Sequence, residues 1–316
     1  MTNEINTAPF RAVHPSEILK DEIASRALSQ KELAARMGMK QSNLSRLLRG
    51  EDLTLSVALK LEDALGIPSD YWMRLQAQYD RDKKAIAVRD ECEKTAINAE
   101  RALSNVLNLP ELYKRLNISS SLFIQNKLSI LDELLGFNSV EICSGDFAGR
   151  IVHNYKKSDS EEVNLKNQMT WLTLAYIQPR KNAPEEAYVK GGAVKAAKEI
   201  SFKANEGGLT EEEIKKVLRK NGIAYSVVPK LEKVPIDAAS LKVGDYPAIV
   251  TAHRSDDING LVFNVLHELG HIDKHLYDSP RTVFIADGDT YSCENRDEQE
   301  ANDFARNMLT APVPIQ

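Results

Sequence analysis

The sequence has no apolar run long enough to cross a membrane. Its longest mostly apolar stretches, Leu261–Leu266 and Met169–Ile177, are far shorter than the roughly 18 residues that a spanning helix needs. The chain begins Met-Thr-Asn-Glu-Ile-Asn-Thr, without a basic segment followed by an apolar one. We therefore expect neither a signal peptide nor a membrane partner.

Cysteine is scarce, and positive charge is not in excess. Cys92, Cys143 and Cys293 are odd in number and far apart, which excludes a disulfide framework and a CxxC metal pair. This usage is typical of a reducing compartment, so we expect a cytoplasmic protein. The net charge of −5 excludes a protein that coats nucleic acid through bulk charge, but it permits a local basic face.

The pattern of the 316 residues indicates three regions. Residues 1–80 are densely helical, residues 81–205 form a helical linker or spacer, and residues 206–316 form a mixed unit. In the mixed unit, residues 223–228 and 248–252 are expected strands, and a capping box at Thr210 begins a helix. The expected fold class is a multi-domain chain, all-α at its N-terminal end and α+β at its C-terminal end.

A metal-binding pattern lies on the helix expected over residues 256–276. Apolar residues spaced three, four and seven apart give this helix one buried face. His267 and His271 are one turn apart, so both imidazoles can face one metal ion. Glu268 beside them suits the general base that takes a proton from water and passes it to the leaving amine. The alternative is a helix with two surface histidines, and the apolar helix and the strand before it favour the zinc site.

The third ligand is expected from a second amphipathic helix, residues 295–309. At 100° per residue, Glu298 falls roughly 50° from the centre of the apolar face and Glu300 roughly 110° away. Glu298 is therefore the expected zinc ligand, with Glu300 as the alternative and Asp297 as a shorter one. Asn302, one turn after Glu298, is expected to hydrogen-bond the free nitrogen of a ligating histidine. A metzincin would need a histidine where Tyr277 stands, which excludes that class.

These two helices resemble the ImmA/IrrE metallopeptidase family. The resemblance rests on His267-Glu268-Leu269-Gly270-His271, on Glu298-Gln299-Glu300-Ala301-Asn302-Asp303-Phe304-Ala305, and on Met308-Leu309 followed by Pro312. It implies a zincin-like domain with His267, His271 and Glu298 on zinc and Glu268 as base. It also implies a repressor or antitoxin protein as the substrate.

Other residues near this pattern have weaker predictions. His275 continues the four-residue series but is expected to be a surface histidine. His253 is also expected at the surface, with a role beside an oxyanion as the alternative. Cys293 is expected to be a small buried hydrophobe.

Residues 29–50 have the pattern of a helix-turn-helix. A capping box begins at Ser29, Gly38 supplies the turn, and Gly50 ends the second helix. The second helix exposes its N-terminal side, where base edges are read; the expected base-contacting residues are Lys40, Gln41, Ser42, Asn43 and Arg46. The expected phosphate contacts are Gln30, Ser45 and Arg49. Residues 30–50 have a net charge of +4, which favours DNA binding over a helical bundle used only for protein contacts.

This segment closely resembles HigA-type antitoxins of the XRE class. The resemblance spans residues 14 to about 80 and rests on His14–Leu19, Leu28–Gln30, Ser45–Gly50, Ala58–Leu61 and Tyr71–Gln76. It implies a homodimer that binds double-stranded operator DNA, represses its own operon and neutralises a toxin that cleaves messenger RNA.

Together, these patterns predict an antitoxin-type transcriptional regulator fused to a zinc peptidase that cleaves a regulatory protein or itself. The first alternative is a pure antitoxin and autorepressor whose metal site is inactive or structural. The second is a dedicated protease that binds DNA only to control its own synthesis.

Overall fold

The computed structural model describes residues 8–143, 164–184, 186–252, 257–278, 283–287 and 296–310. Residue contacts divide the chain into two compact units, Met1–Ala96 and Ile97–Gln316. The expected boundary after residue 80 lies inside one helix, α5 (Ser69–Val106). The expected boundary after residue 205 lies at the end of α10 (Gly192–Glu206), which packs against helices of the same unit.

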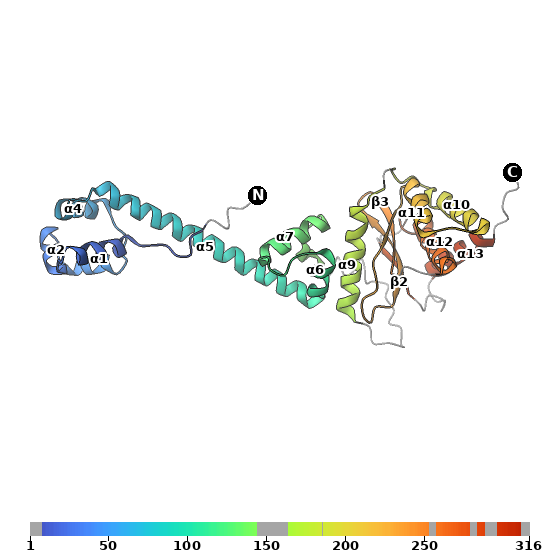
Figure 1. Cartoon of the computed structure of the whole chain (residues 1–316), viewed down its shortest axis with the longest axis horizontal. Coiled ribbons are helices and arrows are strands. Elements are labelled where there is room, and N and C mark those ends of the chain that lie inside the picture. Colours follow the sequence, from blue (N-terminus) through green and yellow to red (C-terminus); the bar gives the residue numbers. More distant parts are fainter. Residues whose placement is uncertain are drawn as a thin grey trace. The chain divides into compact units, whose positions relative to one another are not determined.

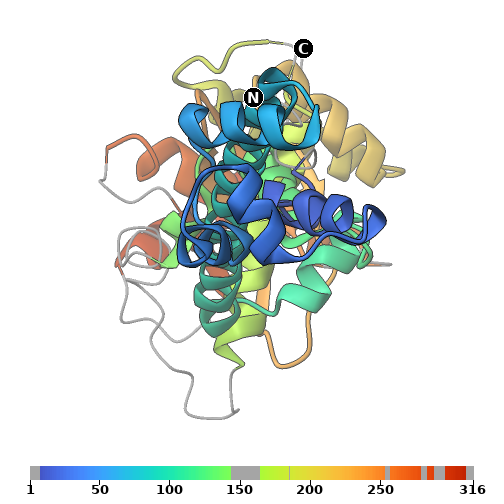
Figure 2. The ribbon, with the colours of Figure 1, turned by 90° about the vertical axis from the view of Figure 1, so that its left-hand side faces the viewer.

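The first unit is helical, as predicted. It contains α1 (Pro15–Ser25), α2 (Gln30–Arg36), α3 (Gln41–Leu48), α4 (Leu55–Leu65) and the beginning of α5 (Figures 1 and 2, blue). The capping box at Ser29 is confirmed, and Gly38 turns the chain between α2 and α3 with a φ of +60°. Five apolar residues in and next to α2 and α3 are buried in the core of this unit: Leu33, Ala34, Met37, Leu44 and Leu47.

The second unit begins with helices that the sequence placed in a spacer. These are α6 (Leu109–Leu116), α7 (Ile124–Leu135), the short 3₁₀ helix η2 (Ser139–Cys143) and α9 (Leu165–Lys181). Asn108, at the start of α6, donates its side-chain amide to Asn167 of α9, and Thr170 of α9 accepts from the Asn108 backbone. These contacts join α6 to the helix that covers the sheet.

A four-stranded mixed sheet forms the centre of the second unit. Its order is β1 (Ala224–Val227), β3 (Tyr246–Thr251), β2 (Ile236–Val243) and β4 (Val283–Asp287). Strands β1 and β3 are parallel, and the other pairs are antiparallel. The sequence predicted β1 and β3 but not β2 or β4.

Helices cover both faces of this sheet (Figure 1). Helix α9 lies on one face, where the Trp171 indole donates to the carbonyl of Val228 at 2.9 Å. Helix α12 (Ile258–Lys274) packs on the opposite face, together with α10, α11 (Glu211–Lys220) and α13 (Arg296–Thr310). The predicted combination of a helical N-terminal part and a mixed C-terminal part is therefore confirmed. No helix in the described ranges is long and apolar enough to span a membrane.

The contact between α12 and α13 is close because Gly270 has no side chain. A methyl group there would lie 3.0 Å from Cα of Ala301 and 3.2 Å from Cβ of Phe304. Because Gly270 has no side chain, the backbone of α13 can approach α12 close to the residues of the candidate metal centre.

Candidate metal centre and nucleic-acid interface

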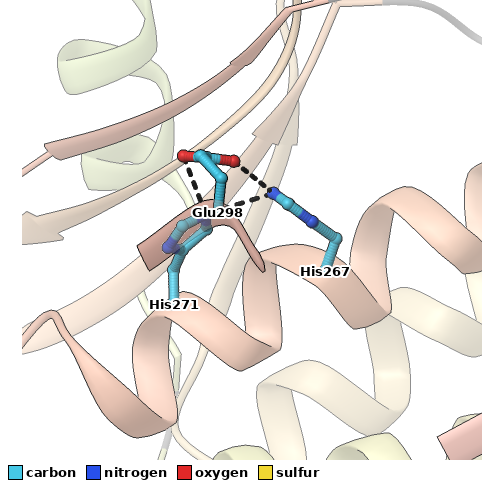
Figure 3. Close-up of side chains that lie close together, drawn as sticks. All are labelled: His267, His271 and Glu298. Atoms are coloured by element: carbon cyan, nitrogen blue, oxygen red, sulfur yellow. Dashed lines mark hydrogen bonds and ion pairs between the residues drawn. The ribbon is translucent and has the colours of Figure 1, made fainter. Parts of the chain in front are cut away.

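Helix α12 presents two histidines to one carboxylate of α13. Asp257 caps the start of α12, and its side chain accepts from the backbone of Asn259. Four-residue spacing then puts His267 and His271 on the same side of α12. Figure 3 shows both imidazoles directed toward Glu298, the residue that the helical geometry favoured over Glu300.

The three side chains lie at the separations expected for ligands of one small ion. The Nε2 atoms of His267 and His271 are 3.1 Å apart, and they lie 3.1 Å and 3.3 Å from the carboxylate oxygens of Glu298. A tetrahedral zinc site with bonds of about 2.0–2.1 Å has edges of about 3.3 Å. Both histidines are buried, and the side chain of Glu298 is 15% exposed.

The remaining ring nitrogens fix the tautomers of both histidines. Nδ1 of His267 lies 3.0 Å from Oδ1 of Asn302, so His267 is the donor and its Nε2 is left with a lone pair. Nε2 of His275 lies 3.3 Å from a Glu300 oxygen, to which it donates. In neutral His275, Nδ1 is then an acceptor for Nδ1–H of His271 at 3.1 Å, and Nε2 of His271 is left with a lone pair.

This donor set fits a zinc ion. Two nitrogen lone pairs and a carboxylate face one another, and one Glu298 oxygen has no hydrogen-bond partner among the described residues. Such a cluster of acceptors needs a cation to hold it together. Two histidines, a glutamate and an open fourth position are typical of catalytic zinc sites. Zinc itself stays a prediction.

The pKa values of the three side chains indicate that protons compete with a metal ion for the same ligand atoms. Burial raises the pKa of Glu298, but its close contacts with the rings of His267 and His271 outweigh this and lower that pKa to about 2. Burial lowers the pKa of His267, but Glu298 outweighs it and the net direction is upward. Burial lowers the pKa of His271. A proton on His267 therefore occupies the lone pair that a metal ion would use.

Glu268 has the environment of a general base. It is fully buried, and its two oxygens have no hydrogen-bond partner in the part of the chain that the structure describes. Burial raises its pKa to about 7, although the charge of His267 and the nearby Ser240 of β2 oppose this rise. A carboxylate that titrates near neutral pH is suited to accepting and returning a proton.

The expectation for His275 was wrong. Its ring is buried, with 8% exposure, because it packs against Phe284 of β4 and contacts Glu300 of α13. Arg296 in turn donates to Glu300 at 2.8 Å. Sequence reasoning also missed Ser240, which lies on a strand that it did not predict. The four-residue series from His267 through His271 to His275 was the available signal for His275. His253 and Cys293 lie outside the described residues.

The predicted DNA-contacting residues lie in α2, in α3 and directly beside α3. Gln30, Lys40, Gln41, Ser42, Asn43, Arg46 and Arg49 are exposed, and Ser45 is half-buried. No side chain caps the start of α3, and the N–H of Asn43 already donates to the carbonyl of Lys40, so the N–H groups of Gln41 and Ser42 are the ones a phosphate could use.

Two of these residues already have local partners. Arg46 pairs with Glu51 at 3.1 Å, and Arg49 donates to the carbonyl of Ser45. Ser45 also lies 3.5 Å from Gln30, which links α3 to α2. A contact of Arg46 with a base would require it first to leave this exposed ion pair, a step that costs little at the surface.

Known proteins resemble the first unit. A helix-turn-helix family matches residues 19–72. The antitoxin HigA-1 of Vibrio cholerae serotype O1 is 37% identical over 71 residues, which are 22% of this chain and 68% of the relative. The chain belongs to the HigA antitoxin family.

A solved structure of the HigA family is also similar. It is an addiction module antidote protein from Coxiella burnetii, 28% identical, covering 27% of this chain and 95% of that chain, with a TM-score of 0.25. The helix-turn-helix match ends at residue 72, before the metal centre begins. The HigA relationship therefore describes the N-terminal part, and the role of the metal centre depends on its own geometry.

Proposed function

We propose that this HigA-family chain is a DNA-binding regulator whose second unit is a zincin-like zinc peptidase that cleaves a regulatory protein or the chain itself. The observation that carries the peptidase proposal is the arrangement of His267, His271 and Glu298 beside the fully buried Glu268. A structural zinc site has no use for such a carboxylate, whereas peptide hydrolysis needs a base at this place.

The residues have distinct roles in the proposed reaction. His267, His271 and Glu298 would hold zinc, and a bound zinc ion supplies a Lewis acid that polarises the peptide carbonyl. Glu268 accepts a proton from the attacking water and delivers it to the nitrogen of the leaving amine. Asn302 and His275 keep the two imidazoles in the tautomers that leave Nε2 unprotonated.

An extended peptide is the substrate that the sheet favours. Strand β4 is at the edge of the sheet, and β2 is its one neighbour within the described ranges. Phe284 of β4 stacks on His271 with ring centroids 4.7 Å apart, and its partner in the register is Ser240, beside Glu268. A peptide that adds to β4 would therefore run past both the metal ligands and the base.

For the first unit, we propose binding of double-stranded operator DNA as a homodimer in the cytoplasm. The support is the HigA relationship, the exposed α3 surface and the local charge of +4. A toxin or a second repressor protein is the proposed protein partner, because the relatives are an antitoxin and an antidote protein by name.

The alternative function is that of a pure antitoxin and autorepressor with a structural metal site. The HigA relationship favours it, because that relationship concerns an antitoxin and not a peptidase.

Glu268→Gln separates the two functions. Purified wild type and Glu268→Gln would be loaded with zinc and incubated with the products of the neighbouring genes, and an operon reporter would be followed under stress. Fragments that form with wild type and not with Glu268→Gln, together with equal DNA affinity and equal zinc content, are the expected result. Zinc in both proteins without any fragment, and equal induction of the reporter, would establish the pure antitoxin.

A further inference from the structure

A hollow of about 780 Å³ lies in the second unit between the end of α5, α6 and the start of α7. Volumes of roughly 300–1,000 Å³ are typical of sites for small organic ligands. All of its lining residues fall between Ile97 and Lys127, so none of them belongs to the metal centre or to the helix-turn-helix.

The inner wall of this hollow is apolar. Leu109, Tyr113 and Ile118 are each buried to more than nine-tenths, and Ile97 is 38% exposed at the edge. Tyr113 lies with its hydroxyl 3.5 Å from Glu100, and burial raises the pKa of this phenol further above its ordinary value. The hydroxyl therefore stays protonated and donates a hydrogen bond to Glu100, the one carboxylate among the lining residues.

The rim is cationic. Arg101, Lys114 and Lys127 line the hollow, which leaves an excess of two positive charges over Glu100. Lys114 pairs with Glu111 at 3.7 Å, whereas neither Arg101 nor Lys127 forms an ion pair within the described ranges. The ammonium of Lys127 lies 5.7 Å from the centre of the Tyr113 ring, which holds it beside the apolar wall.

We propose that this hollow binds a small amphipathic organic anion, with its apolar body against Tyr113, Leu109 and Ile118 and its anionic group between Arg101 and Lys127. The apolar wall has few groups that a strongly polar ligand could use, and the net charge of the lining residues is positive. An anion with an aromatic or aliphatic body satisfies both conditions. The proposal is independent of zinc and of DNA binding.

The test is a fluorescence titration of the full chain with two probes that share one ring system. These are 8-anilinonaphthalene-1-sulfonate, which is anionic, and N-phenyl-1-naphthylamine, which is neutral. We expect the sulfonate to bind more tightly, because one charge-assisted hydrogen bond, to Arg101 or to Lys127, raises the affinity about tenfold. The double variant Arg101→Gln/Lys127→Gln should lose that preference and bind the neutral probe as wild type does.

Two further variants locate the site. Ser104→Phe, which places a ring into the hollow from α5, should abolish binding of both probes. Lys94→Gln removes an exposed cation of α5 outside the hollow and should change neither. Sulfonate affinity that is the same in wild type and in the double variant would overturn the proposal, as would equal binding of the two probes to wild type.

Discussion

In the metal-free protein, Glu268 is expected to lower the free energy of unfolding as the pH rises. The substitution Glu268→Gln should remove this effect. Burial raises the pKa of Glu268 from 4.5 to about 7, so between these values the folded protein holds a proton that the unfolded chain has lost. Stability therefore falls with rising pH across this window. Each pKa unit corresponds to about 1.36 kcal/mol, which gives a total cost of about 3 kcal/mol at pH 8.

The measurement is urea unfolding of the metal-free second unit at pH 5 and at pH 8. The chain has two tryptophans, Trp72 in the first unit and Trp171 in the second, both fully buried. In a Trp72→Phe background, fluorescence reports on the second unit alone. Glutamine has its own desolvation cost, but that cost does not depend on pH. The quantity to compare is therefore the change in unfolding free energy between the two pH values, with and without Glu268→Gln.

We expect that change to be about 2.5 kcal/mol more unfavourable when Glu268 is present, because at pH 5 the unfolded chain has already lost most of this proton. Saturating zinc should reduce the difference, because a nearby cation favours the ionised carboxylate. Parallel pH dependence in the two metal-free proteins would refute the reasoning that burial raises the pKa of Glu268. It would also remove the main support for its role as a base.

Three further predictions concern the ligands and the DNA-reading helix. Glu298→Ala should lose zinc, measured by metal analysis after dialysis, whereas Glu300→Ala should keep the ion at lower affinity; the opposite pattern would make Glu300 the ligand. His275→Ala should weaken zinc binding by about 10–100-fold in a chelator competition, because it frees the Nδ1 of a ligating histidine, and unchanged affinity would contradict this support. Arg46→Ala should cost roughly 1–3 kcal/mol on the operator alone, whereas Arg49→Ala should weaken binding to all duplexes alike; equal affinity of Arg46→Ala and wild type for every duplex would contradict base contact.

Local sequence rules were sufficient for the helices that carry the donors. The four-residue spacing of His267 and His271 needs only that α12 be a helix, and its apolar series establishes that. Glu298 followed from the angular position on α13, and Asn302 from its place one turn later. These predictions concern directions within one helix, which the sequence determines almost alone.

Features that depend on distant segments were not predictable in the same way. Strand β2 is buried along nearly its whole length and has Ala238, Ala239 and Ser240 at its centre, so its middle shows neither alternation nor the residues that favour strands. The burial of His275 depends on Phe284 and Glu300, which come from a strand and a helix later in the chain. The sequence pattern of one helix does not show which later segments will cover its C-terminal end.

The close packing at Gly270 is expected to restrict the size of the ion that the proposed metal site accepts. Because a methyl group at this position would meet backbone atoms of α13 at 3.0 Å, the two helices are in backbone contact, and backbone cannot rotate away as a side chain can. The carboxylate of Glu298 is consequently held at a fixed reach from the histidines of α12. Calcium needs six to eight oxygen ligands at about 2.3–2.6 Å, whereas zinc accepts four ligands at about 2.0–2.2 Å. For the proposed metal site, we therefore expect the missing side chain of Gly270 to favour small ions over large ones, and Gly270→Ala should relax that discrimination before it abolishes binding.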